Sequence, residues 1–467
     1  MPVRPFLFLA LVASLFMTVA APPASAASSQ TVTFESPLDF IDAGKRSQTF
    51  DEISAFGVRS IRVLLYWKDV APNATSRIRP KVDLTSPASY DWSKYEPILD
   101  EAQRRGMRVL LTVTSPAPIW ATKRAGDEVT RPVPDRFREF VIAVSRQFGA
   151  HVSQYSFINE PNLPQFLKPQ YEHGKAVSPA IYRGLYDAAL RGLKAAGDTK
   201  PVLMGETAPN GAAPRTVAPI DFLRGVLCLN SKYQRVGGCT KLRVDGWAHH
   251  AYTRKEGPLA LPPQRLVTVG SLSRLTDALN RAAKTGAVKR NLKIYLTEFG
   301  VQSVPDPNYG VSLQQQNEFR AIAEKIAYNN PRVASFSQYL MTDDPPTGTG
   351  ANCCGRFESG LRTSAGVNKP SFDGFRLPVV AELRGSSVKL WGLVRPATDR
   401  VDVALQRRSG SGAWKTISEP VTNSRGVWTA TSTKVKNGAW RVLWVGPDDV
   451  TYESPAVRAY TWPSRLR

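Results

Sequence analysis

Between about residues 30 and 345, short apolar runs rich in β-branched residues alternate with longer amphipathic segments. Runs buried on both faces and separated by helices are typical of parallel strands joined by helical crossovers. Eight such units predict an α/β fold, a (β/α)8 TIM barrel over residues 27–378. The predicted strands cover residues 31–36, 60–67, 108–114, 154–160, 201–207, 244–252, 293–300 and 333–340.

The segments between these runs have apolar residues every three to four positions, which predicts helices. Pro134 and Pro179 lie where a first helical turn accepts proline, and Gly197 and Gly286 lie where helices end. The clearest helical segments are residues 135–150, 179–197, 272–286 and 314–330. A doubly wound nucleotide-binding sheet is the rival fold, but "TFESPLDF" after the first run is not a glycine-rich phosphate turn.

After Pro370 the pattern changes, and from about residue 379 short alternating runs are separated by turns such as "SGSGA" and "NSRG". Residues 379–467 are therefore predicted to form a small antiparallel, immunoglobulin-like β-sandwich. Six of the ten tryptophans lie in it, and ordinary packing is favoured over a carbohydrate platform for them. They are Trp391, Trp414, Trp428, Trp440, Trp444 and Trp462.

The first 26 residues resemble a secretory signal, with Arg4, an apolar run from Phe6 to Ala21 and an Ala24-Ser25-Ala26 cleavage site. The apolar run is shorter than the roughly 20 residues that a membrane-spanning helix needs. The mature protein is therefore expected to be secreted, with no membrane attachment after cleavage.

Export permits disulfide bonds, and the chain has four cysteines. We favour a bond between Cys228 and Cys239 and a vicinal bond between Cys353 and Cys354; the alternative pairings join the two loops. No cysteine or histidine spacing indicates a metal site.

The formal charge of +22 favours an anionic partner, such as an acidic polysaccharide. The basic residues are scattered and no nucleic-acid-binding motif is present, so specific nucleic-acid binding is not expected.

Carboxylates end several of the predicted strands, which is where a TIM barrel carries its chemistry. They are Glu160, Glu206, Glu298 and the Asp343-Asp344 pair; with Tyr66, Thr114 and Tyr252 they recur every 45 to 48 residues. Glycosidic cleavage needs one protonated and one ionised carboxyl group. Glu160 and Glu298 lie at the ends of the fourth and seventh runs, which face each other across a barrel mouth.

The two contexts "FINEPN" (157–162) and "LTEFG" (296–300) resemble the paired motifs of the clan A glycoside hydrolases, which include the family 5 cellulases and the family 39 glycosidases. The resemblance covers residues 30–375. It implies that Glu160 is the general acid/base, that Glu298 is the nucleophile, and that Asn159 binds the sugar 2-hydroxyl.

The same resemblance implies roles for residues on the second and sixth runs. Arg62 would keep the nucleophile ionised, while His250 and Tyr252 of "HHAY" would line the site, with Tyr252 donating to Glu298. His249 would face away.

Two positions depart from the family 5 pattern. "LTVTSPAPIW" replaces the usual histidine of the third run, and Trp120 is expected to be a sugar-stacking platform. Gln338 and Tyr339 stand where a tryptophan usually ends the eighth run.

Glu206 is expected to contact substrate hydroxyls or pair with an arginine, and it is the alternative acid.

The predicted function is a secreted, monomeric retaining glycoside hydrolase that needs no metal or cofactor. Its predicted substrate is a β-linked glycan, and the charge of +22 keeps an anionic glycan among the candidates. Two alternatives stay open: a non-catalytic carbohydrate- or cell-wall-binding protein, and a transglycosylase that uses the same residues.

Overall fold

The computed structural model describes residues 30–123, 127–347, 357–396 and 399–466. Eight parallel strands close into a barrel in the order β1-β10-β9-β8-β7-β4-β3-β2. The predicted TIM barrel is therefore confirmed. Its strands are β1 (Thr31–Glu35), β2 (Ser60–Tyr66), β3 (Arg108–Thr114), β4 (Gln154–Phe157), β7 (Val202–Thr207), β8 (Gly246–His250), β9 (Ile294–Glu298) and β10 (Val333–Tyr339).

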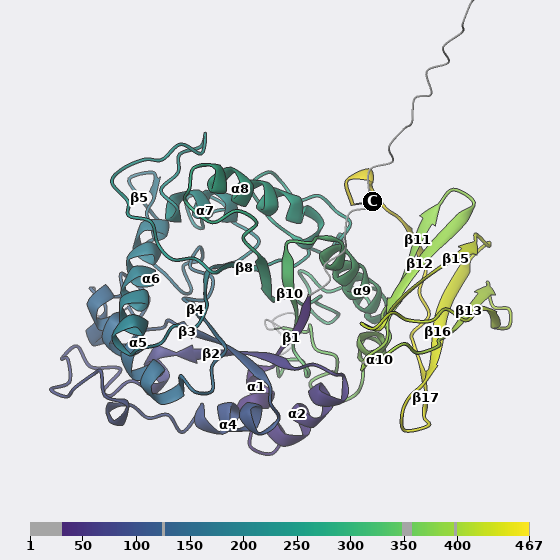
Figure 1. The fold of residues 1–467 in the computed structure, drawn as a ribbon, viewed down its shortest axis with the longest axis horizontal. Coiled ribbons are helices and arrows are strands. Elements are labelled where there is room, and N and C mark those ends of the chain that lie inside the picture. Colours follow the sequence, from purple (N-terminus) through teal and green to yellow (C-terminus); the bar gives the residue numbers. More distant parts are fainter. Residues whose placement is uncertain (1–29, 124–126, 348–356, 397–398, 467) are drawn as a thin grey trace, which may run out of the picture.

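Helices surround the barrel (Figure 1). The longer ones are α2 (Arg46–Ala55), α4 (Glu96–Arg104), α5 (Pro134–Phe148), α6 (Ser178–Ala195), α7 (Pro219–Val226), α8 (Leu272–Lys284) and α9 (Leu313–Asn329). Shorter ones are α1 (Pro37–Ile41), α3 (Trp67–Val70) and α10 (Pro370–Arg376). A two-stranded hairpin of β5 (Tyr171–Glu172) and β6 (Lys175–Ala176) lies in the loop after β4.

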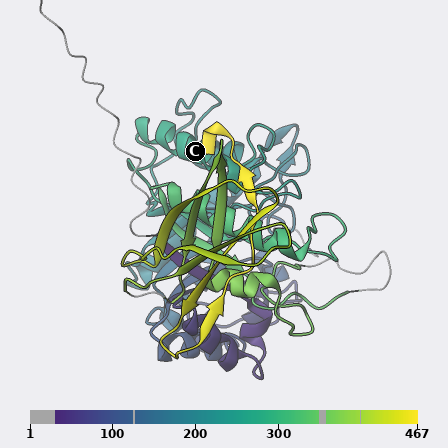
Figure 2. The ribbon, with the colours of Figure 1, turned by 90° about the vertical axis from the view of Figure 1, so that its right-hand side faces the viewer.

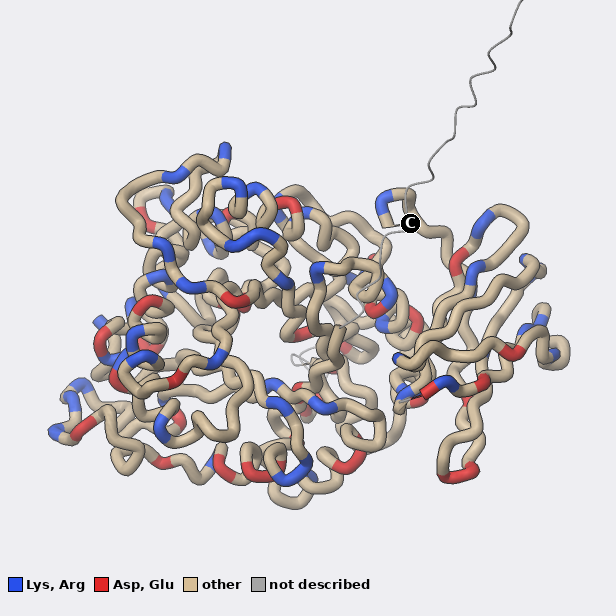
Figure 3. The backbone as a smooth tube through the Cα atoms, in the orientation of Figure 1, with Lys and Arg blue, Asp and Glu red and all other residues tan. Residues whose placement is uncertain are grey.

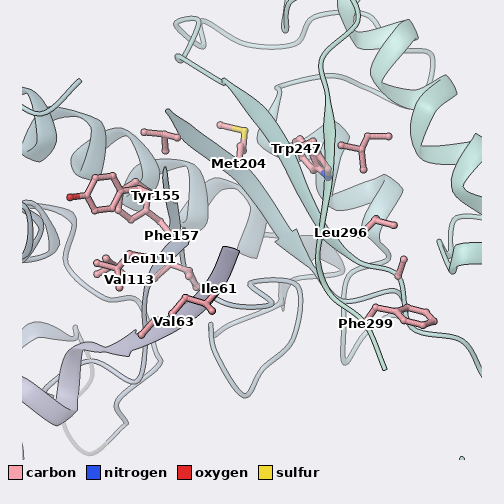
Figure 4. Packing of buried hydrophobic residues seen from close by; sticks show 14 of the residues in the cluster. Ile61, Val63, Leu111, Val113, Tyr155, Phe157, Met204, Trp247, Leu296 and Phe299 are labelled. Carbon is pink, nitrogen blue, oxygen red and sulfur yellow. The ribbon is translucent and has the colours of Figure 1, made fainter. Parts of the chain in front are cut away.

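Alternation along the strands separates two environments. Ile61, Val63 and Leu65 of β2 belong to the main hydrophobic core, which also contains buried residues of the surrounding helices. Figure 4 shows part of this packing. The residue between Ile61 and Val63 is Arg62, which is fully buried. Because neighbouring side chains of a strand point to opposite faces, Arg62 lies on the inner side of the barrel wall.

The C-terminal region contains two four-stranded sheets, which confirms the predicted sandwich (Figure 2). One has the order β15-β12-β11-β18 and the other β14-β13-β16-β17. The strands are β11 (Val379–Arg384), β12 (Ser387–Leu393), β13 (Ala404–Ser409), β14 (Lys415–Ser418), β15 (Val427–Thr433), β16 (Gly438–Val445), β17 (Thr451–Glu453) and β18 (Ala459–Thr461).

Five of the six sandwich tryptophans are buried, which supports packing rather than a carbohydrate platform: Trp391, Trp428, Trp440, Trp444 and Trp462. The sixth, Trp414, is partly buried and lies against the guanidinium groups of Arg408 and Arg441.

The sandwich packs against α9 and α10 (Figure 1). Glu324 of α9 is buried between Arg320, at 2.6 Å, and Arg395 of the C-terminal region. Lys325 pairs with Glu382 of β11 at 3.5 Å. Paired charges at a buried junction fix the orientation of the two parts, because separating them would leave charges unpaired.

A disulfide joins Cys228 and Cys239, as predicted. Cys353, Cys354 and the predicted signal lie outside the described residues. Within the described ranges, no helix is both long and apolar enough to cross a bilayer. Lys and Arg are spread over both parts of the molecule (Figure 3).

Candidate active site

Six charged side chains meet at the carboxyl ends of the barrel strands: Glu35, Arg62, Glu160, Glu206, His250 and Glu298. We call them the inner charge cluster. All are buried except Glu160, whose side chain is 16% exposed. Glu160 is thus the member that a substrate reaches most readily.

The predicted fourth strand ends earlier than expected, at Phe157, because the backbone turns at the next residues. Ile158 and Glu160 have positive φ angles of 57° and 39°. The Asn159 amide donates to Thr114 Oγ1 at 2.8 Å, and the Glu160 amide donates to the Glu206 carbonyl at 2.9 Å. Such uncommon backbone geometry is tolerated where surrounding bonds hold it, often at functional sites.

Glu206 is aimed into the barrel by an irregularity in β7. Gly205 and Glu206 have φ angles of 118° and 48°, and the register with β8 shifts at this point. A side chain at residue 205 would meet the Ala248 carbonyl at 2.5 Å, so this position requires glycine.

Arg62 connects most of the cluster. Its Nη1 donates to Glu35 at 2.7 Å and to Glu298 at 2.9 Å, while Nη2 donates to Asn159 Oδ1 at 2.7 Å and to Glu206 at 3.1 Å. Its Nε donates to Thr112 at 3.0 Å. The guanidinium offers five N–H groups in a rigid fork, so it fixes several acceptors at once.

His250 lies between the carboxylates. Its Nδ1 is 2.9 Å from Glu160 and 3.4 Å from Glu298, and its Nε2 is 2.8 Å from Glu206. Burial opposes the charged imidazolium, but Glu298, Glu160 and Glu206 outweigh it and raise the pKa of His250 to about 10. Both ring nitrogens therefore carry protons near neutral pH and donate to carboxylates.

Glu160 and Glu298 have different surroundings. Burial raises the pKa of Glu160 above its ordinary value, although His250 opposes the rise. Glu298 accepts hydrogen bonds from Arg62 and from the Tyr252 hydroxyl, the latter at 2.6 Å. Oxygen atoms of the two carboxyl groups lie within 4.8 Å of each other. The arrangement can hold one protonated and one ionised carboxyl group side by side.

The surroundings of Glu206 disfavour a role as the alternative acid. Burial would raise its pKa, but Arg62 and His250 outweigh that effect and lower it to about 2. Thr297 Oγ1 also donates to it at 2.7 Å. It is fully buried within the cluster and pairs with an arginine, as predicted, so that it holds Arg62 and His250 in place.

Aromatic rings lie beside Glu298. Tyr339 is edge-on to Tyr252, with ring centroids 6.3 Å apart, and edge-on to Phe357 at 4.9 Å. Phe357 is the first residue of the described range 357–396, and no motif in the sequence marks it. Gln338 is buried and bonded to Arg320, so its role is structural.

Trp120 is not the exposed platform that we expected. Only 8% of it is accessible, its indole donates to the Pro72 carbonyl at 3.0 Å, and its ring packs edge-on against Trp67. A sugar platform needs an open ring face, whereas this ring helps to fix the loop after β3.

His249 faces away from the cluster, as expected, bonded to Thr207 and the Val267 carbonyl.

Asp343 and Asp344 also lie outside the cluster. Asp343 is bonded to Lys369 at 2.7 Å and accepts the Gly360 amide at 2.8 Å. The Asp344 amide donates to the Phe357 carbonyl. Both residues organise the loop after β10.

Glu35 is the cluster member that our sequence reasoning missed. It ends β1, is 1% exposed, and its pKa is raised to about 8, since burial and Glu298 outweigh Arg62. The available signal was a carboxylate at the end of an apolar run, but no motif surrounds it and it does not share the regular spacing.

Glu160, His250 and Glu298 are the group of described residues whose spacing could hold a metal ion. Both nitrogens of His250 are engaged with carboxylates, which leaves no imidazole lone pair for a metal. This chemistry disfavours a metal centre.

No protein-family model matches the chain, and no curated protein matches it. Solved structures do match its fold. A glucosidase from Croceicoccus marinus has a TM-score of 0.53 at 12% identity, over 90% of this chain and 96% of that chain. A family 39 glycoside hydrolase from Bacteroides cellulosilyticus has a TM-score of 0.53 at 16% identity, over 88% and 80%.

A monomeric β-xylosidase from Caulobacter crescentus has a TM-score of 0.52 at 16% identity, over 90% and 97% of the two chains. At identities this low, the TM-scores show a shared fold and nothing more. The fold that the clan A resemblance implied is therefore confirmed, and the chain has the architecture seen in family 39 glycosidases.

Proposed function

We propose that this protein is a retaining O-glycoside hydrolase, with Glu298 as the nucleophile and Glu160 as the general acid/base. The observation that carries the proposal is the approach of the two carboxyl groups, within 4.8 Å, each with its own donors: His250 for Glu160, and Tyr252 and Arg62 for Glu298. Retaining glycosidases place their carboxyl groups about 5–5.5 Å apart, whereas inverting ones need room for a water molecule.

In the first step, Glu298 attacks the anomeric carbon while Glu160 gives its proton to the departing glycosidic oxygen. This produces a covalent glycosyl-enzyme and a free leaving group. Arg62 and Tyr252 donate hydrogen bonds to Glu298 and hold its carboxyl group in position for the attack.

In the second step, ionised Glu160 removes a proton from water, which attacks the anomeric carbon and releases Glu298. His250 donates to Glu160 throughout and so orients the carboxyl group. Asn159 is held by Arg62 through Oδ1, which leaves its Nδ2 as a donor for the sugar 2-hydroxyl.

We propose a β-linked glycan as substrate, with an anionic glycan favoured by the charge of +22, and secretion through the N-terminal segment. A sugar acceptor in place of water would give transglycosylation with the same residues. A non-catalytic carbohydrate-binding role is disfavoured, because both carboxylates and their supporting contacts are present.

The test is a screen of aryl β-glycosides and polysaccharides with the wild type and Glu298→Ala. We expect turnover by the wild type on at least one substrate and a loss of at least about 10⁴-fold in the variant, with its thermal unfolding close to that of the wild type. Comparable turnover in the folded variant would refute the assignment.

A further inference from the structure

Glu35 and the proposed nucleophile share one nitrogen atom. Arg62 Nη1 donates to Glu35 Oε2 at 2.7 Å and to Glu298 Oε2 at 2.9 Å. The two carboxyl groups come from β1 and β9, and Glu35 is 1% exposed. Any change in the charge of Glu35 therefore acts on the same nitrogen, Nη1, that serves Glu298.

The inner charge cluster contains four carboxyl groups but two cations, Arg62 and His250. Uncompensated buried charge is costly, so two of the four carboxyl groups should carry a proton. Glu160 is one of them, because a general acid must hold its proton. Glu206 contacts both cations and Glu298 must attack as an anion, which leaves Glu35 as the second.

The hydrogen bonds of Glu35 agree with the assignment of the second proton to this residue. Glu35 Oε2 accepts from Arg62, while Oε1 is buried with no hydrogen-bond partner among the described residues. Glu206 Oε1 is likewise buried without a partner among the described residues, but Glu206 is bonded to both cations, whereas Glu35 is bonded to Arg62 alone and is the less compensated of the two. A proton on Glu35 Oε1 leaves the bond between its Oε2 and Arg62 intact.

We propose that Glu35 is a positioning residue that is protonated in the active enzyme and holds Arg62 for Glu298, and that its ionisation draws Arg62 away from the nucleophile. The inference rests on the proposed function, since it assigns Glu298 as the nucleophile. An ionised Glu35 would form a stronger, charge-assisted bond to Nη1 and would repel the Glu298 carboxylate.

The groups that face Glu35 decide how its protonation depends on pH. They are Arg62, Tyr66, His250, Tyr252, Glu298 and Tyr339. Burial and Glu298 raise the pKa of Glu35 to about 8, while Arg62 and His250 oppose the rise. Glu35 is therefore protonated below that pH and loses its proton above it.

The experiment compares Glu35→Gln, which imitates the protonated group, with Glu35→Ala, which removes the bond to Arg62. Near pH ~6 we expect kcat to fall about 3-fold in Glu35→Gln and about 10- to 100-fold in Glu35→Ala. Below about pH 10, where His250 keeps both ring protons, the wild type loses two protons as the pH rises, from Glu160 and Glu35, and Glu35→Gln loses one. The limiting slope of log(kcat/KM) against pH should therefore change from about −2 to about −1.

Equal slopes in the wild type and Glu35→Gln would overturn the proposal, and so would equal losses of kcat in the two variants, because either result would show that Glu35 acts as an ionised partner of Arg62. Glu35→Gln and the slope are decisive even if Glu35→Ala does not fold.

Infrared difference spectroscopy supplies a measurement that does not need turnover. Subtracting the Glu35→Gln spectrum from that of the wild type near pH ~6 should leave the carbonyl band of a protonated carboxylic acid. A carboxylate band instead would refute the protonated state. An enzyme that is inactive on every glycoside would refute the proposed function, and the infrared band would still decide the state of Glu35.

Discussion

Tyr252 and Glu298 are joined by a hydrogen bond of 2.6 Å, donated by the phenol to a carboxylate at the end of the neighbouring strand. In Tyr252→Phe the carboxylate loses this donor while the ring contacts with Tyr339 and Phe357 remain. We expect kcat to fall about 10- to 100-fold with little change in KM, since a bond to a charged group is worth about 1.5–3 kcal/mol.

Steady-state kinetics on an aryl glycoside measures this effect. Tyr328→Phe is the matched control, because Tyr328 packs against Trp391 at the sandwich junction. An unchanged kcat in Tyr252→Phe would contradict the role of the phenol.

Arg62→Lys should lower kcat/KM about 100- to 1,000-fold, because an ammonium group cannot reproduce the fork that binds Glu298, Glu206 and Asn159. Arg108→Lys, at the opposite end of the barrel and exposed, is the control and should behave as the wild type. Retained activity in Arg62→Lys would show that charge alone suffices at this position.

Glu160→Ala should separate substrates by their leaving groups. A nitrophenolate departs without a proton, so its release should be slowed little, whereas a sugar or alkyl leaving group should lose about 10²- to 10⁴-fold. Rates for a series of aryl glycosides measure the dependence on leaving-group acidity. An equal loss for all of these substrates would argue against Glu160 as the acid. Glu172→Ala, in the loop after β4, is the control and should behave as the wild type.

Glu324→Gln should destabilise the junction between barrel and sandwich by about 3–5 kcal/mol, because Arg320 and Arg395 would lose a buried partner. Burial would raise the pKa of Glu324, but Arg395 and Arg320 outweigh it and lower the pKa. Its contribution is therefore full above the unfolded value of about 4.3 and is lost as the pH falls through the folded pKa.

Urea unfolding at several pH values checks this prediction, with the exposed Glu419→Gln as control. The difference between wild type and Glu324→Gln should shrink on acidification. A difference that does not depend on pH would show that the ion pairs do not stabilise the junction.

Local patterns predicted the barrel because each strand is a continuous apolar run and each main helix has a clear period. They also located Glu160 and Glu298, whose flanking residues resemble known motifs. The sequence could not reveal that the Trp120 ring is covered, because its burial depends on Trp67, which begins α3, and on Pro72, which follows that helix.

Glu35 was missed for a related reason. A carboxylate at a strand end has no recognisable role until the barrel closes and places it on the guanidinium of Arg62. The two positive φ angles at Ile158 and Glu160, which end β4 early, likewise depend on bonds to β3 and β7.

The anomeric configuration of the first product tests the central claim most directly. NMR of a reaction with an active β-glycoside, recorded before mutarotation, should show the β-anomer, because two displacements at one carbon restore its configuration. The α-anomer as first product would contradict the assignment of Glu298 as a nucleophile paired with Glu160.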